Sequence, residues 1–283
     1  MRIRAMSAAL PGAVALSVLG LPAAAQAAAR PGTTAGLGSF VTRSAHPDTS
    51  LGSMKFSKAV INGGKDIVLG TTTRQSVTVT YTATSSSGVA LTEAFLWQGT
   101  DSSSEDTITG SLGTDDDPDC TESTTQTGVY ACKAVFHINA ASDLKNNGAA
   151  GTWKLFLGGY DLYADASYND DVATTRIKKT SKLTANATPE PVKKGRTITV
   201  TGGLKRADWN SGTYTGYAGQ SVLLQYRKKG STTYTTLKKV TTGTGGSLRT
   251  TTKATADGYY RFSFATNTTT GASTAAGDYV DVK

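Results

Sequence analysis

The chain has 283 residues, of which 38% are hydrophobic and 18% are charged, so it can bury a core and is not a disordered polymer. Thirty-one glycines, abundant threonine and only three methionines argue against a helix-rich protein. Two histidines and two cysteines leave little material for a metal centre or a nucleophilic active site, and the formal net charge is +8.

Residues 1–27 have the three parts of a secretory signal peptide. Arg2 and Arg4 provide a positive start, residues 12–21 form an apolar run, and residues 25–27 (AQA) are a small-x-small cleavage site. The apolar run has a proline on each side and is too short to cross a bilayer core of ~30 Å. We therefore expect a secreted, extracellular protein that does not insert into the membrane.

Residues 28–53 show neither alternation nor helical periodicity, and we expect a flexible linker. From residue 54 onward the sequence consists of short runs in which apolar and polar residues alternate. In residues 76–85 (SVTVTYTATS) apolar side chains alternate with threonine and serine, which is typical of a strand with one buried face. Such strands are expected at residues 59–69, 76–85, 89–97, 106–112, 129–138, 152–160 and 172–178, with a helical turn at residues 140–147.

A second set of strands is expected in the last part of the chain, at residues 181–187, 196–204, 221–229, 234–241, 248–254, 258–265 and 278–282. Tyr259 and Tyr260 follow a turn, where a corner tyrosine often ties a strand to a loop. The pattern predicts an all-β fold of two tandem immunoglobulin-like antiparallel β-sandwich domains. Their expected bounds are residues 54–178 and residues 179–283.

The two expected domains carry opposite charge. Residues 54–178 contain 15 acidic and 9 basic residues, a net charge of −6. Residues 179–283 contain 5 acidic and 16 basic residues, a net charge of +11. This polarity could draw the domains together or give each domain a different partner.

Three phrases in the second half resemble a module that is common in secreted actinobacterial proteins. They are residues 188–201 (TPEPVKKGRTITVT), 225–230 (QYRKKG) and 256–261 (ADGYYR). The module is similar to bacterial immunoglobulin-like domains, and the likeness covers residues 181–283, whereas the first half resembles other secreted sandwich modules only loosely. The resemblance implies the fold and export, and some relatives are described as calcium-binding; it implies no catalytic residues.

Cys120 and Cys132 are expected to form a disulfide, because the signal peptide directs the chain to an oxidising compartment. Closing this short loop would stabilise the fold by ~3 kcal/mol in the chain-entropy model. A rigid loop closed by a disulfide also raises the alternative function of a secreted protease inhibitor, although its acidic content suits few proteases.

An acidic loop provides the candidate metal ligands, which are Asp115, Asp116, Asp117 and Asp119. Oxygen-rich loops suit Ca²⁺, so calcium is the candidate cofactor. An EF-hand is excluded, because its sixth position is Cys120 and its twelfth is Gln126. The alternative is a solvated acidic loop with no metal. A second acidic stretch, residues 161–171, has the same two interpretations, with a hairpin turn as the plainer one.

An aromatic loop provides the candidate binding residues, Trp209, Tyr214 and Tyr217. Exposed rings can stack on sugars or anchor another protein; alternatively, Trp209 covers the open end of a sandwich core. Basic pairs and triplets at residues 193–194, 227–229 and 238–239 suit anionic envelope polymers or protect strand edges. Nucleic acid is not expected, because no recognition helix or stacking motif accompanies the charge.

Catalysis has little support in the sequence. Outside residues 1–53 the one histidine is His137, which the alternation of its strand places on the surface, opposite Phe136. A hydrolase with two carboxylates is the remaining enzyme hypothesis. We therefore expect a secreted, non-enzymatic binding or structural protein that contacts envelope polysaccharide or another extracellular protein, with a calcium-binding module as the alternative.

Overall fold

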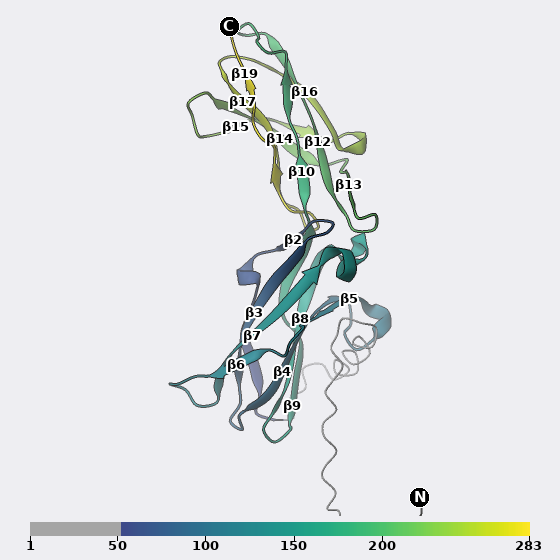
Figure 1. Ribbon diagram of the computed structural model, residues 1–283, viewed down its shortest axis with the longest axis vertical. Helices are drawn as coiled ribbons and strands as arrows, with labels where there is room; N and C mark the ends of the chain where they lie inside the picture. The colour runs from purple at the N-terminus through teal and green to yellow at the C-terminus, as the bar shows by residue number, and fades with distance from the viewer. Residues whose placement is uncertain (1–51) are drawn as a thin grey trace, which may run out of the picture.

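The computed structural model describes residues 52–283 and shows an all-β protein in which two β-sandwiches follow one another along the chain (Figure 1). The expected signal peptide, residues 1–27, and almost all of the expected linker, residues 28–53, lie outside the described residues. Within residues 52–283 there is no helix that is long and apolar enough to cross a membrane.

The N-terminal sandwich consists of two sheets. One has the order β1 (Lys55–Ile61), β3 (Arg74–Thr84), β7 (Val129–Asn139) and β6 (Asp119–Glu122). The other has the order β2 (Ile67–Leu69), β9 (Ala166–Lys179), β8 (Gly151–Asp161), β4 (Val89–Gly99) and β5 (Ile108–Gly113). The expected helical turn after β7 is present as η3 (Ala140–Leu144), followed by η4 (Asn147–Ala149).

The alternation in β3 decides which of its side chains enter the core. Val77, Val79 and Tyr81 are buried, and the residues between them are exposed or half-buried. Phe136 of β7 and Leu155 of β8 belong to the same core cluster, so the two sheets meet there. Burying a side chain such as valine or phenylalanine contributes ~1.5–3 kcal/mol, and this burial is why the period-two pattern predicted the strand correctly.

The prediction of one strand over residues 59–69 is wrong, because the segment contains a tight turn. Asn62, Gly63 and Gly64 all have positive φ, and glycine adopts this conformation readily. The turn (η1, Asn62–Gly64) separates β1 from β2 and sends them to different sheets. β2 then pairs with β9 in parallel, with Ile67 opposite Ile177, so the sheets are not wholly antiparallel.

The C-terminal sandwich also has two sheets. In one, β12 (Thr197–Asp208) pairs with β10 (Ser181–Leu183), β11 (Asn186–Thr188), β13 (Thr213–Gly216) and β16 (Ser247–Lys253). The other has the order β15 (Thr235–Thr241), β14 (Ser221–Lys228), β17 (Gly258–Phe264) and β18 (Ser273–Thr274), with β19 (Asp278–Val280) also paired to β17. Val200, Leu224 and Phe262 are among the fully buried residues of its core.

The expected strand over residues 181–187 is divided into β10 and β11. Both pieces pair with β12, and the break lies at Thr184, beside Gly202 of β12. A Cβ atom on Gly202 would collide with the Thr184 carbonyl oxygen. Only glycine allows the two backbones to approach this closely, which alternation in the sequence does not reveal.

The junction between the sandwiches is short and hydrogen-bonded on both sides. β9 ends at Lys179 and β10 begins at Ser181, with Thr180 between them. The Thr180 N–H donates to the Leu69 carbonyl of the N-terminal sandwich at 2.9 Å, and the Thr180 carbonyl accepts from Ala207 of the C-terminal one at 2.9 Å. The connection is therefore part of both sandwiches rather than a loose linker.

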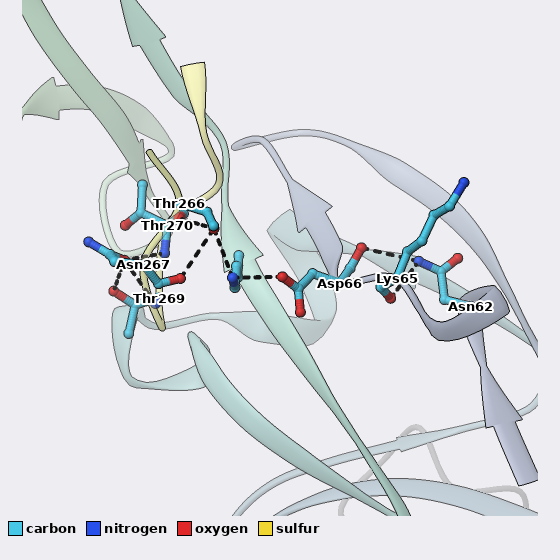
Figure 2. Close-up of polar contacts among 8 residues, drawn as sticks. Asn62, Lys65, Asp66, Thr266, Asn267, Thr269 and Thr270 are labelled. Carbon is cyan, nitrogen blue, oxygen red and sulfur yellow. Dashed lines mark hydrogen bonds and ion pairs between the residues drawn. The ribbon is translucent and has the colours of Figure 1, made fainter. Parts of the chain in front are cut away.

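Lys178 reinforces this junction. Its side chain is 2% exposed, and its Nζ lies 2.6 Å from Asp66 Oδ2 and donates to Thr266 Oγ1 at 2.8 Å. Figure 2 shows Asp66 on one side of this contact and Thr266 on the other. The loop that carries Thr266 is held by Asn267 Oδ1, which accepts from the backbone N–H groups of Thr269 and Thr270. One ammonium group thus binds both sandwiches.

Candidate functional site: a basic cleft and a tyrosine–arginine face

The predicted disulfide is confirmed. Cys120 of β6 lies opposite Cys132 of β7, and their sulfurs are bonded. The bridge closes the hairpin whose tip spans residues 123–128, and Cys132 is part of the buried core. This is the loop in which the sequence raises a protease-inhibitor function, and that function stays a prediction.

The acidic loop places its carboxylates at the surface. Asp115, Asp116, Asp117 and Asp119 are all exposed, and Asp115 Oδ2 lies 2.9 Å from Nδ1 of His137. His137 is 37% exposed, which confirms its predicted position on the surface of β7. Within residues 52–283 no group of three or more His, Cys, Asp or Glu side chains is arranged to hold a metal ion. Calcium at this loop stays a prediction.

The expected exposed contact at Trp209 is wrong, because this ring is buried at the junction. Its side chain is 5% exposed, it belongs to the core cluster of the N-terminal sandwich, and its Nε1 donates to the Gly70 carbonyl at 2.9 Å. Its backbone N–H donates to Asn147 Oδ1 at 3.0 Å, and the Asn147 amide donates to Asp208 Oδ1 at 2.8 Å. The alternative interpretation holds with one change: Trp209 covers the core of the neighbouring sandwich, because the loop that carries it reaches across the junction.

Tyr214 and Tyr217 do not form an aromatic surface with Trp209. Tyr214 packs against the N-terminal core, and its ring centre lies 3.8 Å from Nζ of Lys182. The Tyr217 ring packs against Phe264 in the C-terminal sandwich, and its hydroxyl accepts from the Asn267 amide at 2.9 Å. Both tyrosines are half-buried, so their main role in this structure is packing.

A cleft of about 440 Å³ lies at the end of the C-terminal sandwich that is remote from the junction, where the chain ends (Figure 1). Four lysines line it, Lys194, Lys228, Lys229 and Lys283, and Asp257 is the one acidic residue of its lining. Main-chain bonds assemble the cleft, because the Lys194 N–H donates to the Lys283 carbonyl at 2.8 Å and the Lys229 N–H donates to the Asp257 carbonyl at 2.9 Å. Lysines that are distant in sequence are thereby collected around one opening.

Beside the cleft, alternation in β17 sorts its aromatic residues onto two faces. Tyr260 and Phe262 are buried in the core, whereas Tyr259 and Arg261 face outward and are half-buried. The register places Arg227 of β14 opposite Tyr259, so cationic and aromatic side chains become neighbours on the outer face. This outer face is where the two side-chain types can interact without entering the core.

We call this surface the Tyr–Arg face, and it consists of Arg227, Tyr234, Tyr259, Arg261 and Tyr279. The Arg227 guanidinium lies 4.1 Å from the ring centre of Tyr259 and 5.2 Å from that of Tyr234. The Arg261 guanidinium lies 3.5 Å from the Tyr234 ring, and the Tyr259 and Tyr279 rings are 5.3 Å apart. Cation–π contacts of this kind restrain the side chains of this face.

Lys229 joins the Tyr–Arg face to the cleft. Its Nζ lies 5.5 Å from the Tyr279 ring and 3.7 Å from Asp257 Oδ2. Hydrogen bonding to Tyr279 raises the pKa of Lys229, and the nearby Asp257 carboxylate acts in the same direction. The Val282 N–H, which donates to Asp257 at 2.9 Å, lowers the pKa of that carboxylate, with smaller contributions from Tyr279 and Lys229. Both groups are therefore charged at neutral pH.

The sequence identifies this site only in part. It indicates the basic residues 227–229 as a contact, but it assigns Tyr259 and Tyr260 to a corner role. The tyrosine that ties a strand to the turn is Tyr226, whose hydroxyl donates to the carbonyls of Ala256 and Asp257. The sequence feature that could have predicted the Tyr–Arg face is the alternation in β17. It places Tyr259 and Tyr260 on opposite faces of the sheet, so Tyr259 faces outward once Tyr260 is known to face the core.

No family model and no curated protein matches the chain. Among solved structures, intimin domains are 18% identical to this chain, with a TM-score of 0.26, covering 78% of this chain and 98% of theirs. The Yersinia pseudotuberculosis adhesin InvE is 13% identical, with a TM-score of 0.27 and coverage of 81% and 58%. The Escherichia coli adhesin FdeC is 16% identical, with a TM-score of 0.32 and coverage of 83% and 65%. At these TM-scores the likenesses do not bear on function.

Proposed function

We propose that this chain is a non-enzymatic extracellular binding protein that holds an anionic envelope polysaccharide at the basic cleft and the Tyr–Arg face. The observation that carries the proposal is the arrangement of four lysines around a cleft of about 440 Å³ that continues into the Tyr–Arg face through Lys229. Carboxylates or phosphates on the polymer match the ammonium and guanidinium groups, and the exposed parts of the tyrosine ring faces offer flat surfaces to sugar rings.

The charge distribution orients such a partner. Residues 179–283 carry a net charge of +11 and residues 54–178 carry −6, so an anionic polymer is attracted to one sandwich and repelled by the other. The cleft lies at the end farthest from the acidic sandwich (Figure 1). Because the groups are exposed, the attraction is screened within about 10 Å at 0.1 M salt. We therefore expect binding that is multivalent and strongly dependent on salt.

The expected export of the protein favours an envelope partner over an intracellular one. The sequence of residues 1–27 has the features of a signal peptide, and a secreted basic surface meets cell-wall and capsular polymers first. The cleft itself is lined by ammonium groups and one acidic side chain, a set suited to holding an anion.

The test compares two double substitutions that remove the same charge. Lys228→Gln with Lys229→Gln removes two cations from the cleft, whereas Lys238→Gln with Lys239→Gln removes two from β15, outside it. We expect the first variant to bind polygalacturonate about tenfold more weakly in calorimetric titration, which corresponds to ~1.4 kcal/mol. The second variant should stay within about twofold of wild type.

Neutral dextran is the control ligand, and none of the three proteins should bind it. Equal weakening by both double substitutions would show that net charge, rather than the cleft, attracts the polymer. Absence of binding by the wild-type protein at low salt would refute the proposal.

A further inference from the structure

The loop that joins β8 to β9, residues 162–165, lies at the end of the N-terminal sandwich opposite the junction (Figure 1). Asp161, the last residue of β8, precedes it and is 1% exposed. Its Oδ1 accepts hydrogen bonds from the backbone N–H groups of Tyr163 at 2.9 Å and Asp165 at 3.0 Å. One oxygen of this carboxylate therefore has an evident structural role, which is to hold the loop.

The other oxygen of Asp161 has no such role. Oδ2 is buried and has no hydrogen-bond partner. Among the ion pairs of residues 52–283, none involves Asp161 or Asp165. An ionised oxygen that is removed from water without a donor or a cation is strongly unfavourable, so a buried orphan of this kind points to a bound ion.

A second carboxylate faces the same place. A Cβ atom built on Gly52 would lie 2.5 Å from Asp165 Cβ, 3.0 Å from Asp161 Oδ2 and 3.2 Å from Asp165 Oδ2, so both carboxylates lie beside Gly52. Two negative groups that share a site repel one another unless a positive charge lies between them. Asp165 is exposed, so water can reach the site from its side.

We propose that Asp161 and Asp165 hold a divalent cation of the calcium type. The available protein ligands are oxygens, and Ca²⁺ accepts irregular oxygen sites that water completes, whereas Mg²⁺ demands near-octahedral geometry. With two carboxylates and an open side, the site belongs to the weak extracellular class, with a dissociation constant of ~10⁻⁴–10⁻³ M. This site is separate from the acidic loop at Asp115, where one carboxylate is already paired with His137.

Binding would fix the loop that exposes two large apolar side chains. Leu162 is 69% exposed and Tyr163 is 79% exposed, and Tyr163 is bonded through its backbone to the same carboxylate. A cation on Asp161 therefore neutralises the buried charge and sets the conformation of this tip. The adjacent phenol also makes the site observable, because tyrosine sensitises the luminescence of Tb³⁺ bound nearby.

The experiment titrates the full mature chain with CaCl₂ to about 10 mM in a calorimeter and measures displacement of Tb³⁺ by luminescence. We expect one site per chain in the wild-type protein. Asp165→Asn removes an exposed carboxylate, so it should fold normally and bind Ca²⁺ at least about tenfold more weakly. Asp117→Asn, in the acidic loop, is the matched control and should leave the affinity unchanged.

Asp161→Asn provides a second variant, because the amide retains an acceptor oxygen for the loop but loses the charge. It should bind Ca²⁺ as weakly as Asp165→Asn does, and calcium should no longer raise its melting temperature. The proposal is overturned if wild type binds no Ca²⁺ at about 10 mM, if Asp165→Asn binds like wild type, or if only Asp117→Asn loses binding.

Discussion

The two sandwiches use their aromatic and charged residues in opposite ways. The N-terminal sandwich buries Trp97 and Trp153 in its interior, closes a hairpin with a disulfide and carries a net charge of −6. The C-terminal sandwich has no cysteine, carries +11 and places Tyr259 and Tyr279 on an outer face among cations. Similar layered architectures thus hold large aromatic side chains in the interior in one case and beside cations on an outer face in the other.

The junction is built from side chains of both sandwiches. Trp209 comes from the C-terminal sandwich, yet it is buried in the core cluster of the N-terminal one. Lys178 is carried by the N-terminal sandwich and bonds Thr266 of the other. Each sandwich is therefore contacted by a side chain that the other supplies. Three sets of substitutions distinguish the contribution of the junction to stability from that of each sandwich alone.

The largest effect is expected from Trp209→Ala. Removing a buried tryptophan costs ~3–5 kcal/mol, because it loses apolar burial and leaves a cavity. The loss should appear in the unfolding of the N-terminal sandwich, although the residue belongs to the other one. Urea denaturation followed by circular dichroism measures the change in the free energy of unfolding.

Leu237→Ala is the control for this substitution, because Leu237 is an apolar residue of the C-terminal sandwich that is 42% exposed. It should change the free energy of unfolding by less than ~0.5 kcal/mol. If Trp209→Ala were equally mild, the junction would not couple the sandwiches.

The next effect is expected from replacing both Cys120 and Cys132 by serine. Loss of the bridge removes a constraint on the unfolded chain that contributes ~3 kcal/mol for a loop of this length. Only the unfolding of the N-terminal sandwich should shift in differential scanning calorimetry. Wild-type protein under reducing conditions should match the double variant, and an equal shift of both sandwiches would mean that they unfold as one unit.

The smallest effect is a pH dependence at Lys179. Burial, together with the positive charge of Arg206, lowers the pKa of Lys179 to about 8, and the nearby Asp208 carboxylate partly opposes this shift. Because this pKa is below that of the unfolded chain, the unfolded state binds more protons above pH 8. The contribution of Lys179 to the free energy of unfolding should therefore become more favourable to the folded state as the pH rises from about 8 toward about 10.5, the pKa of Lys179 in the unfolded chain.

Lys179→Met removes this titration while keeping the length of the side chain. The difference in unfolding free energy between wild type and this variant should change in favour of wild type between pH 8 and pH 10. Lys238→Met, on the exposed strand β15, is the comparison and should show a flat difference. If the difference in unfolding free energy between wild type and Lys179→Met also stayed constant with pH, the lowered pKa of Lys179 would be contradicted.

Local patterns in the sequence predicted most of the strands, because period-two alternation reports which side chains face a core. Residues 76–85 became β3 with Val77 and Val79 buried, and the cysteine pair formed its bridge. Short strands such as β13 and β18 were missed, since two to four residues are too few to show a period. The break between β1 and β2 was missed because positive φ at Asn62 gives no periodic signal.

The sequence by itself determined the fold class, the opposite charges of the two halves and the cysteine pairing, because each depends on residue type and near neighbours. Only the tertiary structure decided that Trp209 lies in a core rather than on a surface, and that Lys194, Lys228 and Lys283 line one cleft. The physical reason is distance along the chain. Contacts between residues that are far apart in sequence depend on how sheets register and pack, and no local pattern encodes that arrangement.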